Sequence, residues 1–220
     1  FKMDAHNVTE AMAAINMWIT GADGYKDTYE YQQVMAHLKD GQTEEDGLSY
    51  AMRLFIHYAG HIHQPLHATS RVDNEYEKGD RGGNSFYLPS KDGTKNLHAV
   101  YDAVMYEYTN DAHLPFTSNS IEDFDKNVEK LMSAWPEDQL NNIHDGDYTH
   151  WASDSFQIAS KFTYKAINHE EGKPLPADYV KQGQPILEKQ IVTAGYRLSY
   201  NLQAMFGKSA PAKDVLFLQE

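Results

Sequence analysis

Four histidines lie within fourteen residues of this sequence, in the stretch LFIHYAGHIHQPLH at positions 54–67. His57 and His61 are four residues apart, so on a helix they share one face, one turn apart. Pro65 ends or bends that helix, and His67 follows in the turn, from where its ring can reach the same cavity. Zinc requires convergent imidazoles of this kind, with carboxylates supplied from elsewhere in the chain. The spacing therefore predicts a metal site.

A second group of ligand-type residues lies in the stretch NLHAVYD at positions 96–102. His98 and Asp102 are again four apart, so an imidazole and a carboxylate project from one helix face. A single pair of this kind is most often a surface hydrogen bond. Two such pairs together with the HQPLH turn favour a metal site. With His67 they form a set of two histidines and one carboxylate, which leaves the open coordination position typical of catalytic zinc.

The composition narrows the chemistry further. The chain has no cysteine, so any metal must be held by His, Asp and Glu, and thiolate catalysis is excluded. The net charge of −13 argues against a passive nucleic-acid scaffold, because free nucleic-acid binders are usually basic. A metal-dependent phosphoesterase stays compatible with the acidic charge, since bound metal supplies local positive charge.

Targeting signals in the sequence are few. No run of 18 apolar residues is present, so we expect no membrane span. The first residues, FKMDAHN, lack a signal-peptide pattern. Asn7-Val8-Thr9 is the one glycosylation sequon, and it points to a secretory route. We therefore expect a secreted protein, or one in a lysosome-like or vacuole-like compartment, or a periplasmic one if the source is bacterial.

Hydrophobic periodicity predicts an all-α fold, organised as a single domain over residues 1–220 with one long functional loop. Asn7 and Thr43 are expected to cap helices, since acidic residues follow each of them closely. The loop is expected at 68–95, with a hairpin around Ser85–Leu88. The expected helices cover about 8–20, part of 25–42, 43–63, 96–109, 120–135, 149–168 and 177–206, and the apolar residues 215–218 are expected to form a strap on the domain.

The helix at 43–63 is expected to bury one stripe and to carry the histidines beside it. The expected core stripe consists of Leu48, Ala51, Met52, Phe55, Ile56 and Ala59. His57 and His61 continue a neighbouring stripe, so they should border the buried face. His63 is expected to face away, in a supporting or surface position. Asp80 is expected to belong to a solvated acidic loop.

In order along the chain, these motifs resemble those of the S1/P1 nucleases. The matching motifs are HYAGHIHQPLH, DRGGN at 80–84, NLHxxxD, HWASDS at 150–155 and GYRL at 195–198. Members of this family are zinc-dependent, largely α-helical nucleases with 3′-nucleotidase activity, and they share their fold with bacterial zinc phospholipase C. The resemblance extends over nearly the whole chain.

The resemblance implies roles for individual residues. His57 matches a ligand of one metal of a close pair, while His67, His98 and Asp102 match the complete protein ligand set of another zinc. Family members hold up to three zinc ions. Gly82 and Asn84 match the GGN turn at the family's nucleobase pocket, although Gly-Gly-Asn is also a common tight turn.

Two departures from the family pattern bear on activity. The family has an aspartate where this chain has His61, and that aspartate bridges two metals. An imidazole cannot do so at that spacing, because its nitrogens point in divergent directions. His61 therefore either ligates a single metal or marks the loss of one zinc. The family's N-terminal Trp, His, Asp and His ligands also have no match here, so we expect an N-terminal fragment of the same protein as a partner.

The resemblance implies hydrolysis of phosphodiester bonds in single-stranded DNA or RNA by a metal-activated water, with no side chain assigned as the catalytic base. One alternative is a phospholipase C-type phosphoesterase on the same scaffold. Another is a catalytically impaired metal-binding protein, because His61 replaces the aspartate.

Overall fold

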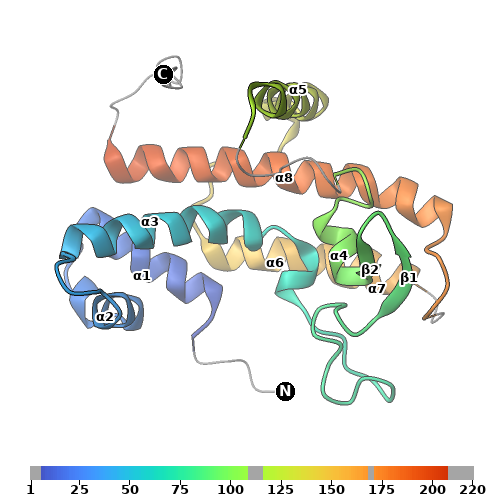
Figure 1. Cartoon of the computed structure of the whole chain (residues 1–220), viewed down its shortest axis with the longest axis horizontal. Coiled ribbons are helices and arrows are strands. Elements are labelled where there is room, and N and C mark those ends of the chain that lie inside the picture. Colours follow the sequence, from blue (N-terminus) through green and yellow to red (C-terminus); the bar gives the residue numbers. More distant parts are fainter. Residues whose placement is uncertain (1–5, 109–115, 168–170, 208–220) are drawn as a thin grey trace.

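The computed structural model describes residues 6–108, 116–167 and 171–207, and this part of the chain is mostly helical, as predicted (Figure 1). The expected strap at 215–218 lies outside the described residues. The helices are α1 (Val8–Thr20), α2 (Tyr29–Ala36), α3 (Glu44–His61), α4 (Leu97–Asp102), α5 (Ser118–Ala134), α6 (Tyr148–Ile158), α7 (Tyr164–Ala166) and α8 (Ala177–Phe206), and the antiparallel strands are β1 (Tyr87–Lys91) and β2 (Thr94–Asn96).

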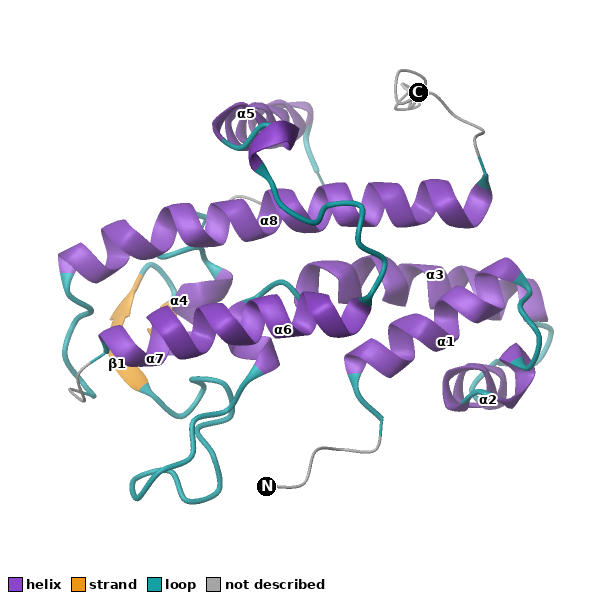
Figure 2. Ribbon diagram, turned by 180° about the vertical axis from the view of Figure 1, so that it is seen from behind, coloured by secondary structure: helices purple, strands orange, loops and turns teal. Residues whose placement is uncertain are grey.

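The long helix α8 separates the other elements into two sides. Helices α3, α1 and α6 lie on one side of it, while α5 packs alone on the other (Figures 1 and 2). The hairpin and α4 lie near the N-terminal half of α8. No helix in the described part of the chain combines the length and the apolarity that a membrane span requires.

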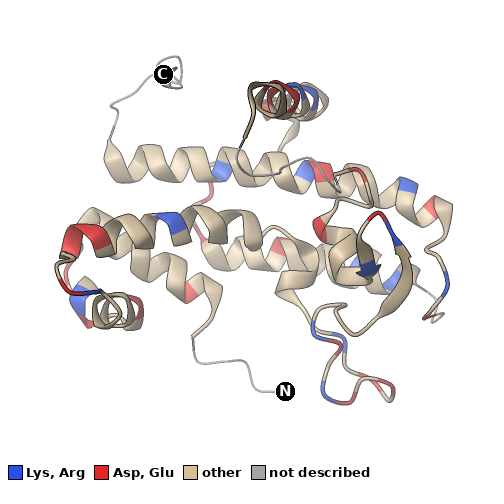
Figure 3. Ribbon diagram, viewed as in Figure 1, with Lys and Arg blue, Asp and Glu red and all other residues tan. Residues whose placement is uncertain are grey.

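Capping residues fix the first residues of α1 and α3, the two helices that carry the N-terminal half of the core. The Asn7 side chain accepts hydrogen bonds from the backbone N–H groups of Thr9 and Glu10, which caps α1. Thr43 and Asp46 form a capping box at the start of α3. Acidic residues gather at this end of α3 (Figure 3), where their negative charge interacts favourably with the helix dipole.

Two apolar clusters hold the elements that carry the candidate ligands. One lies among α1, α3 and α6 and contains Met12, Ile15, Trp18, Ala51, Phe55, Ala59, Ile62, Tyr148 and Trp151. The other joins the hairpin, α4 and α8 and contains Leu66, Phe86, Leu88, Leu97, Val100, Tyr101, Val104, Met105, Ile167, Tyr179 and Leu187. Because α3 belongs to the first cluster and α4 to the second, the space between the clusters is where their polar side chains meet.

The expected core stripe of α3 was wrong at Ile56. Ala51, Phe55 and Ala59 are fully buried, but Ile56 is 44% exposed. Successive residues of a helix are about 100° apart, so Ile56 cannot share the direction of Phe55. It lies instead beside His57 on the wall of the cleft between α3 and α8.

Two predicted helices differ from the observed ones. The helix expected at 96–109 ends at Asp102, because Val104, Met105 and Tyr106 have φ values of 49°, 54° and 72°, which an α-helix does not allow. The helix expected at 149–168 is interrupted by a π-helical turn, η4 (Ala159–Thr163).

Asp80 is completely buried, which corrects the prediction of a solvated position. Its carboxylate accepts hydrogen bonds from the backbone N–H of Arg71 at 2.9 Å and from the Tyr164 hydroxyl at 2.8 Å. These bonds join the first part of the long loop, at Arg71, to its middle at Asp80 and to α7. The loop is therefore anchored next to the GGN turn that follows Asp80.

Phe55 and Ile56 offer a matched pair for testing this packing. Phe55→Ala should lower the free energy of unfolding by about 3–5 kcal/mol, since it empties a fully buried site against Tyr148. Ile56→Ala should change it by about 0.5 kcal/mol, as expected of an exposed side chain. Chemical denaturation of both variants measures the difference, and equal losses would contradict the assigned face of α3.

Candidate metal centre

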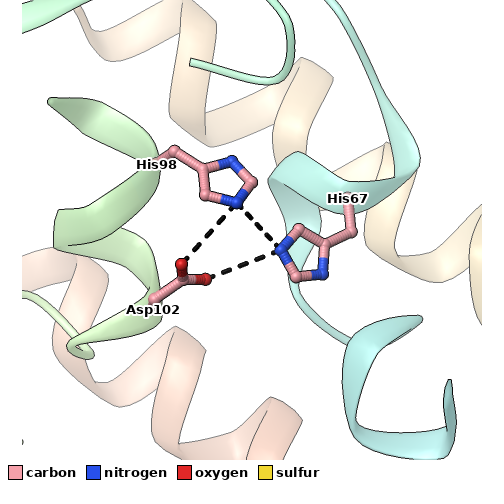
Figure 4. A group of neighbouring side chains, drawn as sticks. All are labelled: His67, His98 and Asp102. Atoms are coloured by element: carbon pink, nitrogen blue, oxygen red, sulfur yellow. Dashed lines mark hydrogen bonds and ion pairs between the residues drawn. The ribbon is translucent and has the colours of Figure 1, made fainter. Parts of the chain in front are cut away.

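Three short segments bring the candidate ligands together. His57 and His61 lie in the last turns of α3. The chain then enters a 3-10 turn, η2 (Pro65–Ala68), which carries His67. Helix α4 presents His98 and Asp102 from the opposite side (Figure 4).

The polar atoms of His67, His98 and Asp102 converge on one point. The Nε2 atoms of the two histidines are 3.0 Å apart, and each lies 3.6 Å from a carboxylate oxygen of Asp102. Ligand atoms about 2.0–2.1 Å from a tetrahedral zinc are about 3.3 Å from one another. The spacing of these three donors therefore fits a zinc ion with a fourth position open.

The tautomers of both histidines are fixed by the backbone. Nδ1 of His67 donates to the carbonyl oxygen of His61 at 2.9 Å, and Nδ1 of His98 donates to that of Gly82 at 2.7 Å. A carbonyl can only accept, so each neutral ring carries its proton on Nδ1 and a lone pair on Nε2. Two lone pairs and a carboxylate thus face one another, an arrangement that requires a cation or a proton between them.

Gln64 is a supporting residue that the sequence analysis did not identify. Its amide Nε2 donates to Asp102 at 3.0 Å, while its Oε1 accepts from the backbone N–H of Leu66. Partial burial opposes ionisation of Asp102, but the contacts with His67 and Gln64 outweigh it, so the pKa of this carboxyl is below its usual value. The local signal was the position of Gln64 directly before Pro65, which is typical of a helix cap.

The GGN turn connects the two halves of this centre. The carbonyl of Gly82 holds His98, and a Cβ on Gly82 would lie 2.3 Å from the carbonyl oxygen of Leu66 in the turn that carries His67. Gly82 also has a φ of 62°, which glycine adopts without strain. Asn84 is half-buried, and its amide donates to the carbonyl of Arg81 at 2.9 Å.

His57 and His61 lie beside this group without joining it. Their ring centroids are 4.7 Å apart, and the ring of His61 stacks on that of His67 at 3.7 Å. Partial burial and the imidazoles of His67 and His57 lower the pKa of His61 to about 4, so its ring is neutral. Within the described residues, the one group of three metal-type ligands is His67, His98 and Asp102.

A cleft of about 470 Å³ between α3 and α8 opens onto the centre, and His57, His61, His67 and Asp102 lie on its wall. Apolar side chains of α8, including Leu187 and Ile191, form the opposite wall. The arrangement provides a concave site with polar ligands on one side and an apolar surface facing them.

His63 does not occupy a surface position, which corrects that part of its prediction. It is 2% exposed, and its Nδ1 donates to the carbonyl of Ala59 at 2.6 Å. Its Nε2 accepts from Arg197 at 3.0 Å, and Arg197 also pairs with Asp154 at 2.7 Å. Burial and the positive charge of Arg197 lower the pKa of His63 to about 4, so the ring is a neutral support for the turn.

The family relationship can be tested directly against known proteins. Residues 16–207 match the family model described as S1/P1 Nuclease, which is most of the chain. The chain belongs to the S1/P1 nuclease family. The matched range includes every candidate ligand of the metal centre.

Curated relatives agree with this assignment. Endonuclease 4 of Arabidopsis thaliana is 30% identical over 165 residues, covering 72% of this chain and 51% of that protein. Endonuclease 1 of the same plant is 26% identical over 186 residues, covering 78% and 55%, and Nuclease S1 of Aspergillus oryzae is 25% identical over 158 residues, covering 68% and 52%. The S1/P1-type chain spans about half the length of the curated relatives it matches.

Gly82 and Gly93 provide a test of how the turn supports the centre. Both have positive φ, but a Cβ at Gly93 meets no atom within 4 Å. Gly93→Ala should therefore lower the free energy of unfolding by about 1 kcal/mol through backbone strain alone. Gly82→Ala should cost more than about 2 kcal/mol and weaken zinc binding, because the backbone at Leu66 must move. Denaturation and zinc titration of both variants separate the effects, and unchanged zinc affinity in Gly82→Ala would refute the link.

Replacing His98 tests whether this group of residues binds zinc. We expect His98→Gln to weaken zinc binding at least about tenfold, because it removes one of three protein donors. His150→Gln is the matched control, since His150 also contacts a carboxylate, Asp145, at 3.1 Å but belongs to no three-ligand group among the described residues. Competition titration with a coloured chelator gives both affinities. Equal zinc affinity in the two variants would exclude His98 as a ligand.

Proposed function

We propose that this protein hydrolyses phosphodiester bonds in single-stranded DNA or RNA, and 3′-phosphates of nucleotides, with zinc held by His67, His98 and Asp102. The observation that carries the proposal is the convergence of two imidazole lone pairs and a carboxylate at a cleft. Membership in a nuclease family supports the same reaction class.

In this reaction the protein's own residues would hold the metal, offset part of its charge and keep the two imidazole rings in place. Bound zinc would polarise the phosphoryl oxygens and lower the pKa of a water molecule, which makes a strong side-chain base unnecessary. Asp102 offsets one of the two positive charges, so the loaded site stays positive and attracts a phosphate in an otherwise acidic protein. The carbonyls of His61 and Gly82 keep both rings in the orientation that binding requires.

We propose that the GGN turn contributes to nucleobase binding through Gly82 and Asn84. Asn84 uses one amide N–H for the carbonyl of Arg81, and its second N–H and its Oδ1 form no hydrogen bond with the described residues. An amide presents a donor and an acceptor to the edge of a base. That edge is accessible in a single strand and paired in a duplex, so the turn would favour single strands.

The pair His57 and His61 supports a proposal about further metals. Two imidazoles alone leave a zinc site incomplete, and the described residues supply no third ligand there. We propose that an N-terminal fragment of the same protein supplies the additional ligands, giving up to three zinc ions. His61 would then ligate one metal, because a single ring cannot bridge two.

A proposal about the cellular compartment of the protein rests on the glycosylation sequon at Asn7. Its sequon residue Thr9 donates a hydrogen bond from its hydroxyl to the Asn7 side-chain oxygen at 2.6 Å. We propose that Asn7 is glycosylated and that the protein is secreted or acts in a lysosome-like or vacuole-like compartment, or in the periplasm if the source is bacterial. Mass analysis before and after glycosidase treatment tests this.

Metal removal provides the main test of the activity. EDTA should lower the cleavage of single-stranded DNA and RNA at least about a hundredfold, and zinc should restore it, because the metal stabilises the transition state by several kcal/mol. His67→Gln should have the same effect as EDTA, and His150→Gln should have none. Cleavage that survives complete metal removal would refute the proposed mechanism.

Two further assays distinguish the proposed nuclease from a phospholipase C-type enzyme and from a catalytically impaired metal-binding protein. Release of phosphocholine from phosphatidylcholine, with no cleavage of single-stranded DNA, would identify a phospholipase C-type enzyme instead. Zinc binding without hydrolysis of any phosphoester, even with an N-terminal fragment added, would identify a metal-binding protein impaired at His61. In that case His61→Asp should restore activity.

A further inference from the structure

A second cleft, of about 710 Å³, lies on the side of α8 that faces α6 and the segment joining α5 to α6. Figure 2 shows that segment crossing α8 before it enters α6. Arg197 of α8 holds the backbone of this segment, because its Nε donates to the carbonyl of Asn142 at 3.1 Å. None of the proposed zinc ligands lines this cleft.

Three backbone irregularities meet at its walls. The π-helical turn η4 carries Lys161 and Phe162, Pro185 interrupts the hydrogen bonding within α8, and Asn142 has a φ of 56°. Each of these features is less stable than regular helix or ordinary loop backbone, and π turns occur frequently at functional sites. Their coincidence at one cleft is the pattern expected of a binding site.

Two lysines of the cleft, Lys161 and Lys189, have no acidic partner among the described residues. Nζ of Lys161 is bonded to the neutral amide oxygen of Gln157 at 2.8 Å, and Nζ of Lys189 lies 5.5 Å from the centre of the Trp135 ring. The acid on the wall, Asp154, is already paired with Arg197. Among the described residues neither lysine forms an ion pair, so the cleft is positive in a chain of net charge −13.

Aromatic surfaces lie next to these charges. Trp135 and Phe162 both line the cleft, and Phe162 is held by parallel stacking on Tyr179, with ring centroids 5.0 Å apart. The indole N–H of Trp135 is buried and has no hydrogen-bond partner among the described residues. Ammonium groups suit a phosphate, and aromatic faces suit a planar base.

We propose that this cleft binds a nucleotide unit, with its phosphate between Lys161 and Lys189 and its base against Trp135 or Phe162. The side-chain amide of Asn141 supplies a donor and an acceptor for the base edge, and the amide N–H of Gln157, whose oxygen accepts from Lys161, supplies a further donor. This site is separate from the metal centre, and the two clefts share the side chain of Gln190, whose amide donates to the carbonyl of His63 at 2.9 Å. It would hold product or a distant part of a strand.

Binding of adenosine 5′-monophosphate in EDTA tests the site without any hydrolysis. We expect quenching of tryptophan fluorescence and one-to-one binding by calorimetry, with inorganic phosphate and adenosine each binding at least tenfold more weakly. The double variant Lys161→Gln, Lys189→Gln should bind at least tenfold more weakly than wild type. Lys126→Gln, Lys130→Gln on α5 makes the same charge change and should bind normally, as should His98→Gln.

Specific outcomes would overturn the proposal. Equal affinity in wild type and Lys161→Gln, Lys189→Gln would do so, and loss of binding in His98→Gln would place the nucleotide at the metal centre instead. The variant Lys161→Arg, Lys189→Arg keeps both positive charges and should keep the affinity, which separates the effect of charge from an effect on folding.

A deoxyadenosine decamer distinguishes two natural ligands. Tighter binding of the decamer than of the mononucleotide would identify the natural ligand as a strand, and equal affinity would identify it as a free nucleotide. Because hydrolysis plays no part, these results stand whether or not the chain is a nuclease.

Discussion

Two imidazole nitrogens that face each other at 3.0 Å, both with lone pairs, are the constraint on which the functional part of this structure depends. Such an arrangement is repulsive unless a cation or proton lies between the nitrogens, so the surrounding structure must hold it. Backbone carbonyls of His61 and Gly82 fix the rings, and Gln64 fixes the carboxylate of Asp102. The end of α3, the GGN turn and the start of η2 are therefore parts of one assembly.

The same helices serve the core and the clefts through different faces. Phe55 and Ala59 bury one face of α3 against α1 and α6, while His57 and His61, two residues beyond each, lie on the face that borders α8. Helix α8 contributes to both clefts, because Ile191 and Lys189 lie on different faces of it. Stability and binding are thus supplied by separate stripes of the same helix, which allows a site to change without loss of the core.

Local patterns predicted the candidate ligand residues, of which the structure brings His67, His98 and Asp102 together, but not the bonds that hold them. The spacing of four between His98 and Asp102 is a property of one helix, so the sequence was sufficient to identify it. The bonds from His98 to Gly82 and from Gln64 to Asp102 join residues 16 and 38 positions apart, and no local period encodes them. The burial of His63 likewise depends on Arg197, 134 positions away. The early end of α4 followed from positive φ values that its residue types rarely adopt.

The role of residue 61 divides between its backbone and its side chain. Its carbonyl orients His67, and any residue type can supply that carbonyl. Its imidazole stacks on His67 and points toward His57, where a further metal is proposed. Under the proposed function, histidine in place of the aspartate that the family resemblance implies would alter the ligands of the proposed further metal, while the backbone bond from His67 to the carbonyl of residue 61 is kept. A change of the side chain at position 61 therefore need not disturb the group of His67, His98 and Asp102, whose orientation uses only the backbone of that residue.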